Sequence, residues 1–144
     1  MSTEENKALV RRIFDEIMNE RKLDVIDELF ADDYVFHGPG GHEFHGKDSF
    51  KQFISRPHTA YPDFHLEAED MLAEGDKVVC RFTSHGTHKG PLGNIPPTGK
   101  QIDVTGMVIY RIDNGKVTEH WENLDMFGAM QQLGVIPSPE QGKK

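Results

Sequence analysis

The first part of the chain carries apolar residues at helical spacing. Ser2 and Glu5 have the spacing of a capping box, in which each side chain satisfies a backbone group of the other at a helix start. Apolar residues then recur three or four positions apart, which is the spacing of one buried helical face. The pattern predicts a helix that ends near Asn19. The residues of its buried face are Leu9, Val10, Ile13, Phe14 and Ile17.

Two shorter helices and one strand are expected before the pattern changes. The second helix starts near residue 24 and the third near residue 48, and Pro57 limits the third helix or bends it. Between these helices, residues 34–37 have the pattern of a short strand. The glycine and proline content of residues 38–46 indicates a loop.

From residue 64 onward, apolar and polar residues alternate in long stretches, which is typical of strands. The sequence Asp113-Asn114-Gly115 is a strong hairpin signal between the last two of them. A short helix follows at residues 127–133 and stops at Gly134. The expected strands cover residues 64–74, 77–88, 101–112 and 115–125.

Helices followed by a long antiparallel meander predict an α+β fold. We expect a cone-shaped barrel, in which a curved antiparallel sheet wraps over the N-terminal helices and leaves a cavity between them. With 144 residues the chain fits one domain, which we assign to residues 1–136. The polar residues 137–144 are expected to form a flexible tail.

Composition narrows the choice of partners and compartment. The net charge is −8 without a cluster of Lys and Arg, which argues against nucleic acid as a partner. No apolar run is long enough to span a membrane, and the N-terminus lacks the order of a signal peptide, so a cytoplasmic location is expected. The single cysteine, Cys80, lies in an apolar run and is expected to be a buried thiol.

The stretch from Gly115 to Asp125 offers the clearest candidate chemistry. Glu119, Trp121, Asn123 and Asp125 occupy every second position, so a strand places all four on one face. A large aromatic side chain has little use in solvent, and unpaired carboxylates do not fit a dry core. The combination predicts the wall of a small-molecule pocket.

The hairpin register decides which residues share that face. A two-residue turn at Asn114-Gly115 would place Val108 and Tyr110 beside Trp121. A three-residue turn with a bulge at Gly115 would place Met107 and Arg111 there instead, together with Thr105 and Ile109. We favour the second register, which also brings Arg111 near Glu119. Their pairing fits a structural salt bridge or a substrate contact equally well.

Three segments resemble a known family. They are GTHKGPLGNIPPTGK (86–100), GMVIYRIDNGKVTEHWENLD (106–125) and QQLGVIP (131–137), and they are similar to signature segments of the SnoaL-like polyketide cyclase (ester cyclase) family. That family belongs to the nuclear-transport-factor-like superfamily of α+β cones. The resemblance therefore supports the predicted fold, although one fold hosts unrelated activities.

The resemblance also implies a reaction and its residues. In the family, an Asp at the far end of the last strand acts as acid and base in an intramolecular aldol ring closure, and Asp125 is the matching residue here. Such proton transfer requires no metal or cofactor when the enolate is delocalised. Asp125 also suits the N-cap of the helix at 127–133, so a structural role is the alternative. His88 of the GTH segment is a second pocket candidate, with a surface position at the loop edge as its alternative.

Further candidates would position the substrate. Trp121 can stack on a planar ring system, and Asn123 can hold a substrate oxygen. Phe14, Phe36 and Phe53 would complete an apolar cavity. The substrate-binding candidates are Trp121, Asn123, Glu119, Arg111, Met107, Phe14, Phe36, His37, Phe53 and His65.

The remaining histidines raise the question of a metal. His37, His42 and His45, with Glu43 between them, have ligand chemistry, but the metal-binding β-barrels they suggest are nearly all strand. This chain begins with helices, so no metal and no cofactor are expected. His58, His85 and His120 are interpreted as surface residues, and His65 faces either the cavity or solvent.

These inferences define one expected function and its rivals. We expect an enzyme, a homodimer through its sheet, that takes an apolar, oxygen-bearing small molecule and moves protons at carbon. The alternative is a non-catalytic ligand-binding or scaffolding domain of the same fold, and a third choice is an isomerase or hydrolase in the same pocket.

Overall fold

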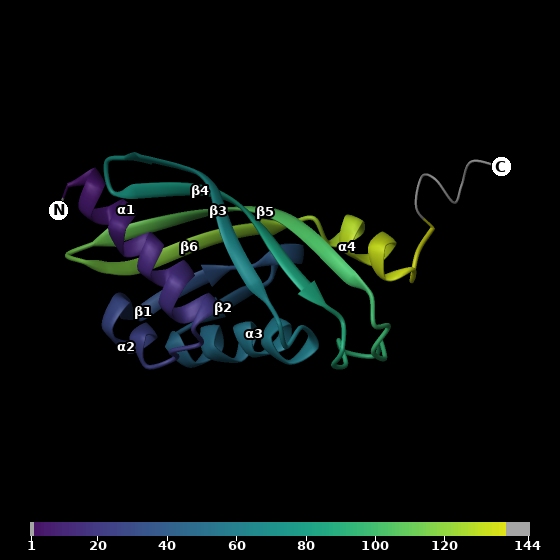
Figure 1. Ribbon diagram of the computed structural model, residues 1–144. Coiled ribbons are helices and arrows are strands. Elements are labelled where there is room, and N and C mark those ends of the chain that lie inside the picture. Colours follow the sequence, from purple (N-terminus) through teal and green to yellow (C-terminus); the bar gives the residue numbers. More distant parts are fainter. Residues whose placement is uncertain (1, 138–144) are drawn as a thin grey trace.

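The computed structural model describes residues 2–137, and Figure 1 shows how its elements are arranged. The predicted capping box is present: the Ser2 side chain accepts a hydrogen bond from the Glu5 N–H, and the Glu5 side chain accepts one from the Ser2 N–H. The first helix continues without a break into a π-helical segment, η1, so the predicted end near Asn19 is confirmed. The helices are α1 (Thr3–Arg12), η1 (Ile13–Asn19), α2 (Val25–Leu29), the short 3-10 turn η2 (Pro39–Gly41), α3 (Lys47–Ala60) and α4 (Met126–Leu133).

Six strands form one sheet in the order β2-β1-β6-β5-β4-β3. All neighbouring strands are antiparallel except β1 and β6, which run parallel, so the sheet is mixed rather than wholly antiparallel. The loop expected at residues 38–46 contains the short strand β2. The strands are β1 (Phe30–His37), β2 (Glu43–His45), β3 (His65–Glu74), β4 (Lys77–Thr87), β5 (Gln101–Asp113) and β6 (Lys116–Leu124).

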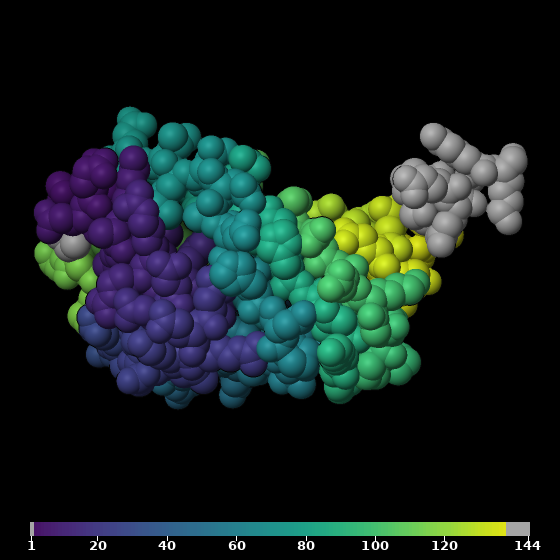
Figure 2. Space-filling model, viewed as in Figure 1, coloured from purple at the N-terminus to yellow at the C-terminus, as the bar shows by residue number. Residues whose placement is uncertain are grey.

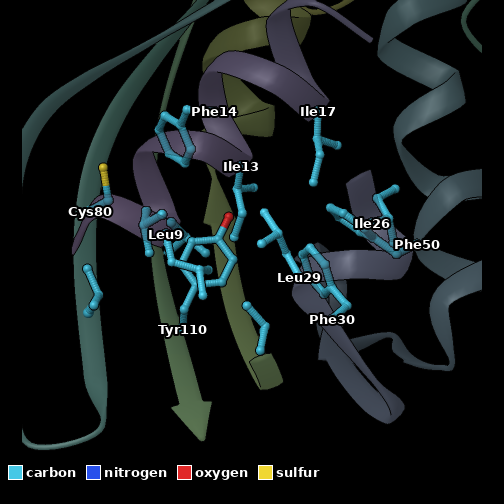
Figure 3. Close-up of a cluster of buried hydrophobic side chains, with 14 of the residues drawn as sticks. Leu9, Ile13, Phe14, Ile17, Ile26, Leu29, Phe30, Phe50, Cys80 and Tyr110 are labelled. Atoms are coloured by element: carbon cyan, nitrogen blue, oxygen red, sulfur yellow. The ribbon is translucent and has the colours of Figure 1, made fainter. Parts of the chain in front are cut away.

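The helices cover one face of this sheet, which confirms the predicted α+β fold. In Figure 1, α1 crosses in front of the long strands, while α2 and α3 lie below and α4 lies at the opposite end from the N-terminus. In Figure 2 the N-terminal segment covers one half of the visible face, and the C-terminal segment lies at the other end. Figure 3 shows side chains from η1, α2 and the sheet converging in the core, among them Ile13, Leu29 and Cys80. Burial raises the pKa of the Cys80 thiol to about 11, in line with an unreactive core residue.

The β5–β6 hairpin has a two-residue turn, so the favoured three-residue turn is wrong. Asn114 and Gly115 have φ of 50° and 77°, as a type I′ turn requires. A bulge at Thr118 then shifts the register, so that Arg111 opposes Glu119 while Ile112 opposes Val117. The bulge therefore produces the same pairing of Arg111 with Glu119 that the three-residue turn predicted. Arg111 and Met107 therefore do share a face with Trp121.

None of the helices in residues 2–137 is long and apolar enough to cross a membrane. The predicted tail lies beyond the described residues, apart from Pro137.

Candidate active site

A cavity of about 610 Å³ lies between η1, α3, α4 and the inward face of the sheet. Its walls are mostly apolar, and phenylalanine is their commonest residue. The π-helical segment contributes Phe14 and Met18, which are four residues apart and therefore lie on one helical face. Such a wall suits a flat apolar molecule, because aromatic rings bury large areas against it. The phenylalanines of the lining are Phe14, Phe44, Phe50, Phe53, Phe64, Phe82 and Phe127.

Polar groups are few in this lining and come from different elements. Two carboxylates are among them, Glu122 from β6 and Asp125 from the turn that follows it. Tyr110 contributes a phenol from β5, and Arg56 is a cationic member of the lining. A few polar groups in a mostly apolar cavity are the usual means of orienting a small ligand.

Asp125 lies at the edge of the cavity where β6 gives way to α4. It is exposed and forms the N-cap of α4, with its Oδ1 accepting a hydrogen bond from the Gly128 N–H at 2.9 Å. Oδ2 has no hydrogen-bond partner among residues 2–137. The capping alternative and the pocket position are thus both true of this residue. One oxygen fixes the carboxylate and the other remains available to a ligand.

Gly128 allows the carboxylate to take this position. A Cβ at residue 128 would collide with the Oδ2 of Asp125 and would lie 2.8 Å from its Cγ. Any larger residue there would push the carboxylate away from its present place. The turn is therefore built around Asp125, since the glycine provides the room and its N–H provides the hydrogen bond.

The face of β6 that points inward carries His120, Glu122 and Leu124. Trp121 lies on the opposite face of the strand. His120 is fully buried, which corrects its interpretation as a surface residue. Its ring stacks on Phe36 at 4.2 Å between centroids, and its Nδ1 lies 2.6 Å from the Tyr34 hydroxyl oxygen. Burial lowers the pKa of the His120 imidazole, so the ring is neutral near pH 7.

Trp121 lies on the outward face of the sheet, which corrects its expected place in the cavity wall. The Arg111 guanidinium lies 5.3 Å from the Trp121 ring centroid, and the His37 ring stacks on it at 5.4 Å. Glu119 accepts a hydrogen bond from Arg111 Nη1 at 2.8 Å and pairs with His37 Nε2 at 2.7 Å. Met107 lies on the same outward face and is 56% exposed. None of these side chains is in the cavity lining.

The physical reason for this correction is the bulge. Val117 is buried on the inward face, and strict alternation from it would also turn Glu119 and Trp121 inward. The extra residue at Thr118 breaks the alternation, so the even-numbered positions face inward beyond it. Trp121 keeps its large apolar area partly covered by its cationic and imidazole neighbours instead.

The other predicted residues fall into two groups. Phe14, Phe53 and Asp125 are brought together by the cavity. Asn123 also borders it, but it is exposed and opposes Met107 on the outward face of β6, which corrects its expected place beside the substrate. Outside its lining are Phe36, which is core, His65, which is exposed on β3, and His88.

His88 is fully buried, which corrects its expected positions in the pocket and at the surface. Its Nδ1 lies 3.0 Å from the Thr98 hydroxyl and accepts a hydrogen bond from the Thr98 N–H at 3.2 Å. These contacts fix the loop that follows β4. The His88 ring lies 5.7 Å from that of Tyr61, a lining residue, so any effect on a ligand would pass through Tyr61.

Sequence reasoning missed Glu122 and gave Tyr110 only as the less favoured alternative. The signal for both was available in the apolar positions Val108 and Tyr110, which alternate toward the core on β5. On β6, Glu122 lies opposite Val108 and His120 lies opposite Tyr110, so these two residues share the inward face. No group of three or more metal-ligand side chains is close enough to hold an ion within residues 2–137.

An apolar cavity of this size in an α+β fold, with carboxylates in its lining, has the features of small-molecule sites. The chain belongs to the SnoaL-like polyketide cyclase family, whose sequence model matches residues 8–133. The family resemblance seen in the sequence is thereby confirmed.

The chain is similar to two ester cyclases in sequence, and to solved structures of other proteins in fold. The chain is 31% identical over 136 residues to the aklanonic acid methyl ester cyclase DnrD of Streptomyces peucetius, covering 92% of this chain and 93% of that protein. It is 27% identical over 118 residues to the nogalonic acid methyl ester cyclase of Streptomyces nogalater, covering 81% and 88% of the two chains. AclR from Streptomyces galilaeus, described as a putative hydroxylase, has a TM-score of 0.85 at 29% identity, with 95% of this chain and 85% of that chain covered. TsrD from Streptomyces laurentii has a TM-score of 0.83 at 26% identity, with 94% and 99% covered.

Proposed function

We propose that this protein is an enzyme that transfers protons at carbon without a cofactor, as in the intramolecular aldol cyclisation of a polyketide-like ester or ketone. The observation that carries the proposal is the place of Asp125. Its carboxylate stands at the edge of the aromatic cavity, anchored through Oδ1 and with Oδ2 free of partners among the described residues.

The chemistry needs one carboxylate that is used twice. In the first step, the Asp125 carboxylate takes a proton from the carbon alpha to a carbonyl, and the electron pair of the broken C–H bond forms an enolate. The enolate carbon then attacks a second carbonyl of the same molecule, which forms the ring C–C bond and leaves an alkoxide. In the last step, the Asp125 carboxylic acid returns its proton to the alkoxide oxygen. General acid–base catalysis of this kind contributes about 10²- to 10⁴-fold to a rate.

Other lining residues would position the substrate. Phe14 and Phe53 provide flat apolar walls near the turn that carries Asp125. The relatives are named as cyclases of the methyl esters of aklanonic and nogalonic acids. These two esters are therefore the trial substrates that we propose.

The decisive variant is Asp125→Asn. Asparagine is as good an N-cap as aspartate, so the amide oxygen can keep the bond to Gly128 while the base is lost. We expect cyclisation of a trial ester to fall by about 10²-fold or more, with thermal stability almost unchanged. Turnover equal to that of the wild type would contradict the role of Asp125.

A second variant tests the position of the carboxylate rather than its presence. Gly128→Ala keeps Asp125 but forces its carboxylate to move. We expect the cyclisation rate to fall, as we also expect for Asp125→Asn. Full activity in Gly128→Ala would show that the carboxylate does not act from the position seen in the structure.

A non-catalytic ligand-binding or scaffolding domain is the alternative. It predicts that the trial esters bind or fail to bind without conversion, and that Asp125→Asn changes nothing but stability. An isomerase or hydrolase in the same cavity would convert ligands without forming a ring, which mass spectrometry of the products distinguishes.

We also propose a homodimer that forms through the outward face of the sheet. Leu72, Val79, Ile109 and Trp121 lie directly across from one another on four adjacent strands. Leu72 is 69% exposed, so this row presents an apolar surface of the kind that oligomers cover. The cytoplasmic location stays a prediction.

A further inference from the structure

A second polar site lies in the same cavity, on the inward face of β5 and β6. Tyr110 opposes His120 across the two strands, and Glu122 lies two residues beyond His120 on the same face. Tyr110 and Glu122 are therefore diagonal neighbours, and both line the cavity. Figure 3 shows Tyr110 extending from the sheet toward the helical segment that carries Ile13 and Phe14, with its hydroxyl at the far end.

The two groups offer complementary hydrogen-bonding capacity. Burial, reinforced by the charge of Glu122, holds the pKa of the Tyr110 phenol well above its ordinary value, so the phenol keeps its proton and is a donor. Its hydroxyl makes no hydrogen bond to any residue between 2 and 137. Glu122 has a side chain only 14% exposed, and within the same residues its single partner is His120, through Oε1. Oε2 is left as an acceptor.

His120 and Tyr34 hold Glu122 in place. Burial raises the pKa of the Tyr34 phenol, so its O–H donates to His120 Nδ1 at 2.6 Å. The neutral imidazole then carries its one proton on Nε2, which donates to Glu122 Oε1 at 3.3 Å. The His120 ring is stacked on Phe36 and meets the edge of Phe50, so it has no freedom to turn. The chain of bonds Tyr34–His120–Glu122 runs from the core to the cavity.

We infer that Glu122 and Tyr110 recognise a hydroxyl next to a carbonyl on the substrate, with Oε2 of Glu122 accepting from the hydroxyl and Tyr110 donating to the carbonyl oxygen. The substrate class is then a flat apolar molecule that carries a phenol or enol beside a ketone or ester. His120 and Tyr34 are positioning residues that act through Glu122. A ligand that lacks the hydroxyl would leave Oε2 of this mostly buried carboxylate without a partner, an arrangement that discriminates strongly against such an analogue.

This inference rests on the proposed function in one respect, namely that the substrate binds in this cavity. It does not depend on the catalytic role of Asp125. It is therefore tested by binding. The probes are 2-naphthol and 2-methoxynaphthalene, which have the same ring system but differ in whether their oxygen can donate. Their dissociation constants are measured by calorimetry at pH 7.5 for the wild type and for the variants Glu122→Gln, Tyr34→Phe and Glu69→Gln. Glu69 is an exposed carboxylate on β3, outside the lining, and controls for the loss of one charge.

The wild type is expected to bind 2-naphthol roughly 10-fold more tightly than the ether, because a hydrogen bond to a charged group is stronger than one to a neutral group. Glu122→Gln should reduce that ratio to about 3-fold or less, and Glu69→Gln should leave it unchanged. Tyr34→Phe should give an intermediate ratio, and nitrogen NMR of the His120 ring should show the Nε2–H tautomer alone in the wild type and a mixture of the Nε2–H and Nδ1–H tautomers in this variant. A merely structural role for Tyr34 would alter stability without changing the ring tautomer.

Three results would overturn the inference. They are a wild type that does not prefer 2-naphthol, a ratio in Glu122→Gln equal to that of the wild type, and no binding of either probe to the wild type. If the wild type shows no preference for 2-naphthol but still closes the ring of the trial esters, this inference alone is refuted. If the wild type shows the expected preference but closes no ring, the proposed function alone is refuted.

Discussion

The two faces of strand β6 differ in what they do with similar residue types. The inward face buries His120 and turns Glu122 toward the cavity, where Oε1 of Glu122 is held by His120 and Oε2 is left open to a ligand. The outward face holds Glu119 and Trp121 in a half-exposed network with Arg111. A carboxylate and an aromatic ring are therefore not evidence of a site by themselves. The face on which they lie decides their role.

The bulge at Thr118 is what separates the two faces. Without an extra residue there, the buried Val117 and the buried His120 could not both point inward, because strand side chains alternate. Three predictions test this comparison.

The largest effect is expected from deleting single residues of β6. Deletion of Trp121, which lies outside the bulge, reverses the alternation of the residues beyond it and turns inward-facing positions out. We expect a loss of about 2–3 kcal/mol, since the change turns the partly buried Glu122 and Leu124 out of the cavity wall and lies at the upper end of ordinary single-site effects. Deletion of Thr118 only regularises the hairpin and should cost about 1 kcal/mol or less. Urea unfolding measures both, with Trp121→Ala as the control for the lost side chain. Equal costs for the two deletions would refute the role given to the bulge.

The second-largest effect is expected on dimer formation through the outward face of the sheet. Met107→Arg places a charge on this face, and we expect the dimer to dissociate at least about 100-fold more readily, because an unpaired charge is costly to bury. Sedimentation of the variant at a range of concentrations measures this. Ser55→Arg adds the same charge on the exposed surface of α3 and should leave the dimer intact. A wild type that sediments as a monomer would contradict the proposed dimer.

The smallest effect is the pH dependence due to His120. Burial lowers the pKa of His120 in the folded state below its ordinary value of 6.5. As the pH falls below 6.5, the unfolded chain therefore binds a proton at this residue that the folded chain does not, and stability is lost. The loss approaches about 1.4 kcal/mol per pH unit until the folded-state pKa is reached.

The variant His120→Gln isolates this contribution. Burial lowers the pKa of His58 and so acts in the same direction, while the hydrogen bond to Asp103 raises the pKa of His85, which stabilises the fold at low pH. Both remain in the variant and cancel in the comparison. Urea unfolding between pH 7.5 and 5.5 should show a steeper loss in the wild type. Equal slopes would mean that His120 is not held neutral by burial.

The helices and long strands could be predicted from the sequence because their signals are local. The capping box at Ser2, the spacing of Ile13 and Ile17, and the turn at Asn114-Gly115 all act over a few residues. The role of Asp125 at the end of the last strand came from the family resemblance and stays a prediction, although the residue does lie in the cavity lining.

The inward set of β6 could not be predicted because it depends on contacts between distant segments. His120 is buried only because Tyr34, Phe36 and Phe50 surround its ring, and these come from β1 and α3. A bulge such as that at Thr118 also leaves no distinct local signal. The parallel pairing of β1 with β6 is equally a matter of long-range packing, and it brings Tyr34 to its place.

The central claim is that the Asp125 carboxylate removes a proton from carbon in this cavity. It is tested most directly by the rate at which the protein exchanges the hydrogen alpha to a carbonyl of a trial methyl ester for deuterium in D₂O, followed by mass spectrometry. We expect the wild type to incorporate deuterium and Asp125→Asn to do so about 10²-fold more slowly or worse. Equal incorporation by the two proteins would contradict the account.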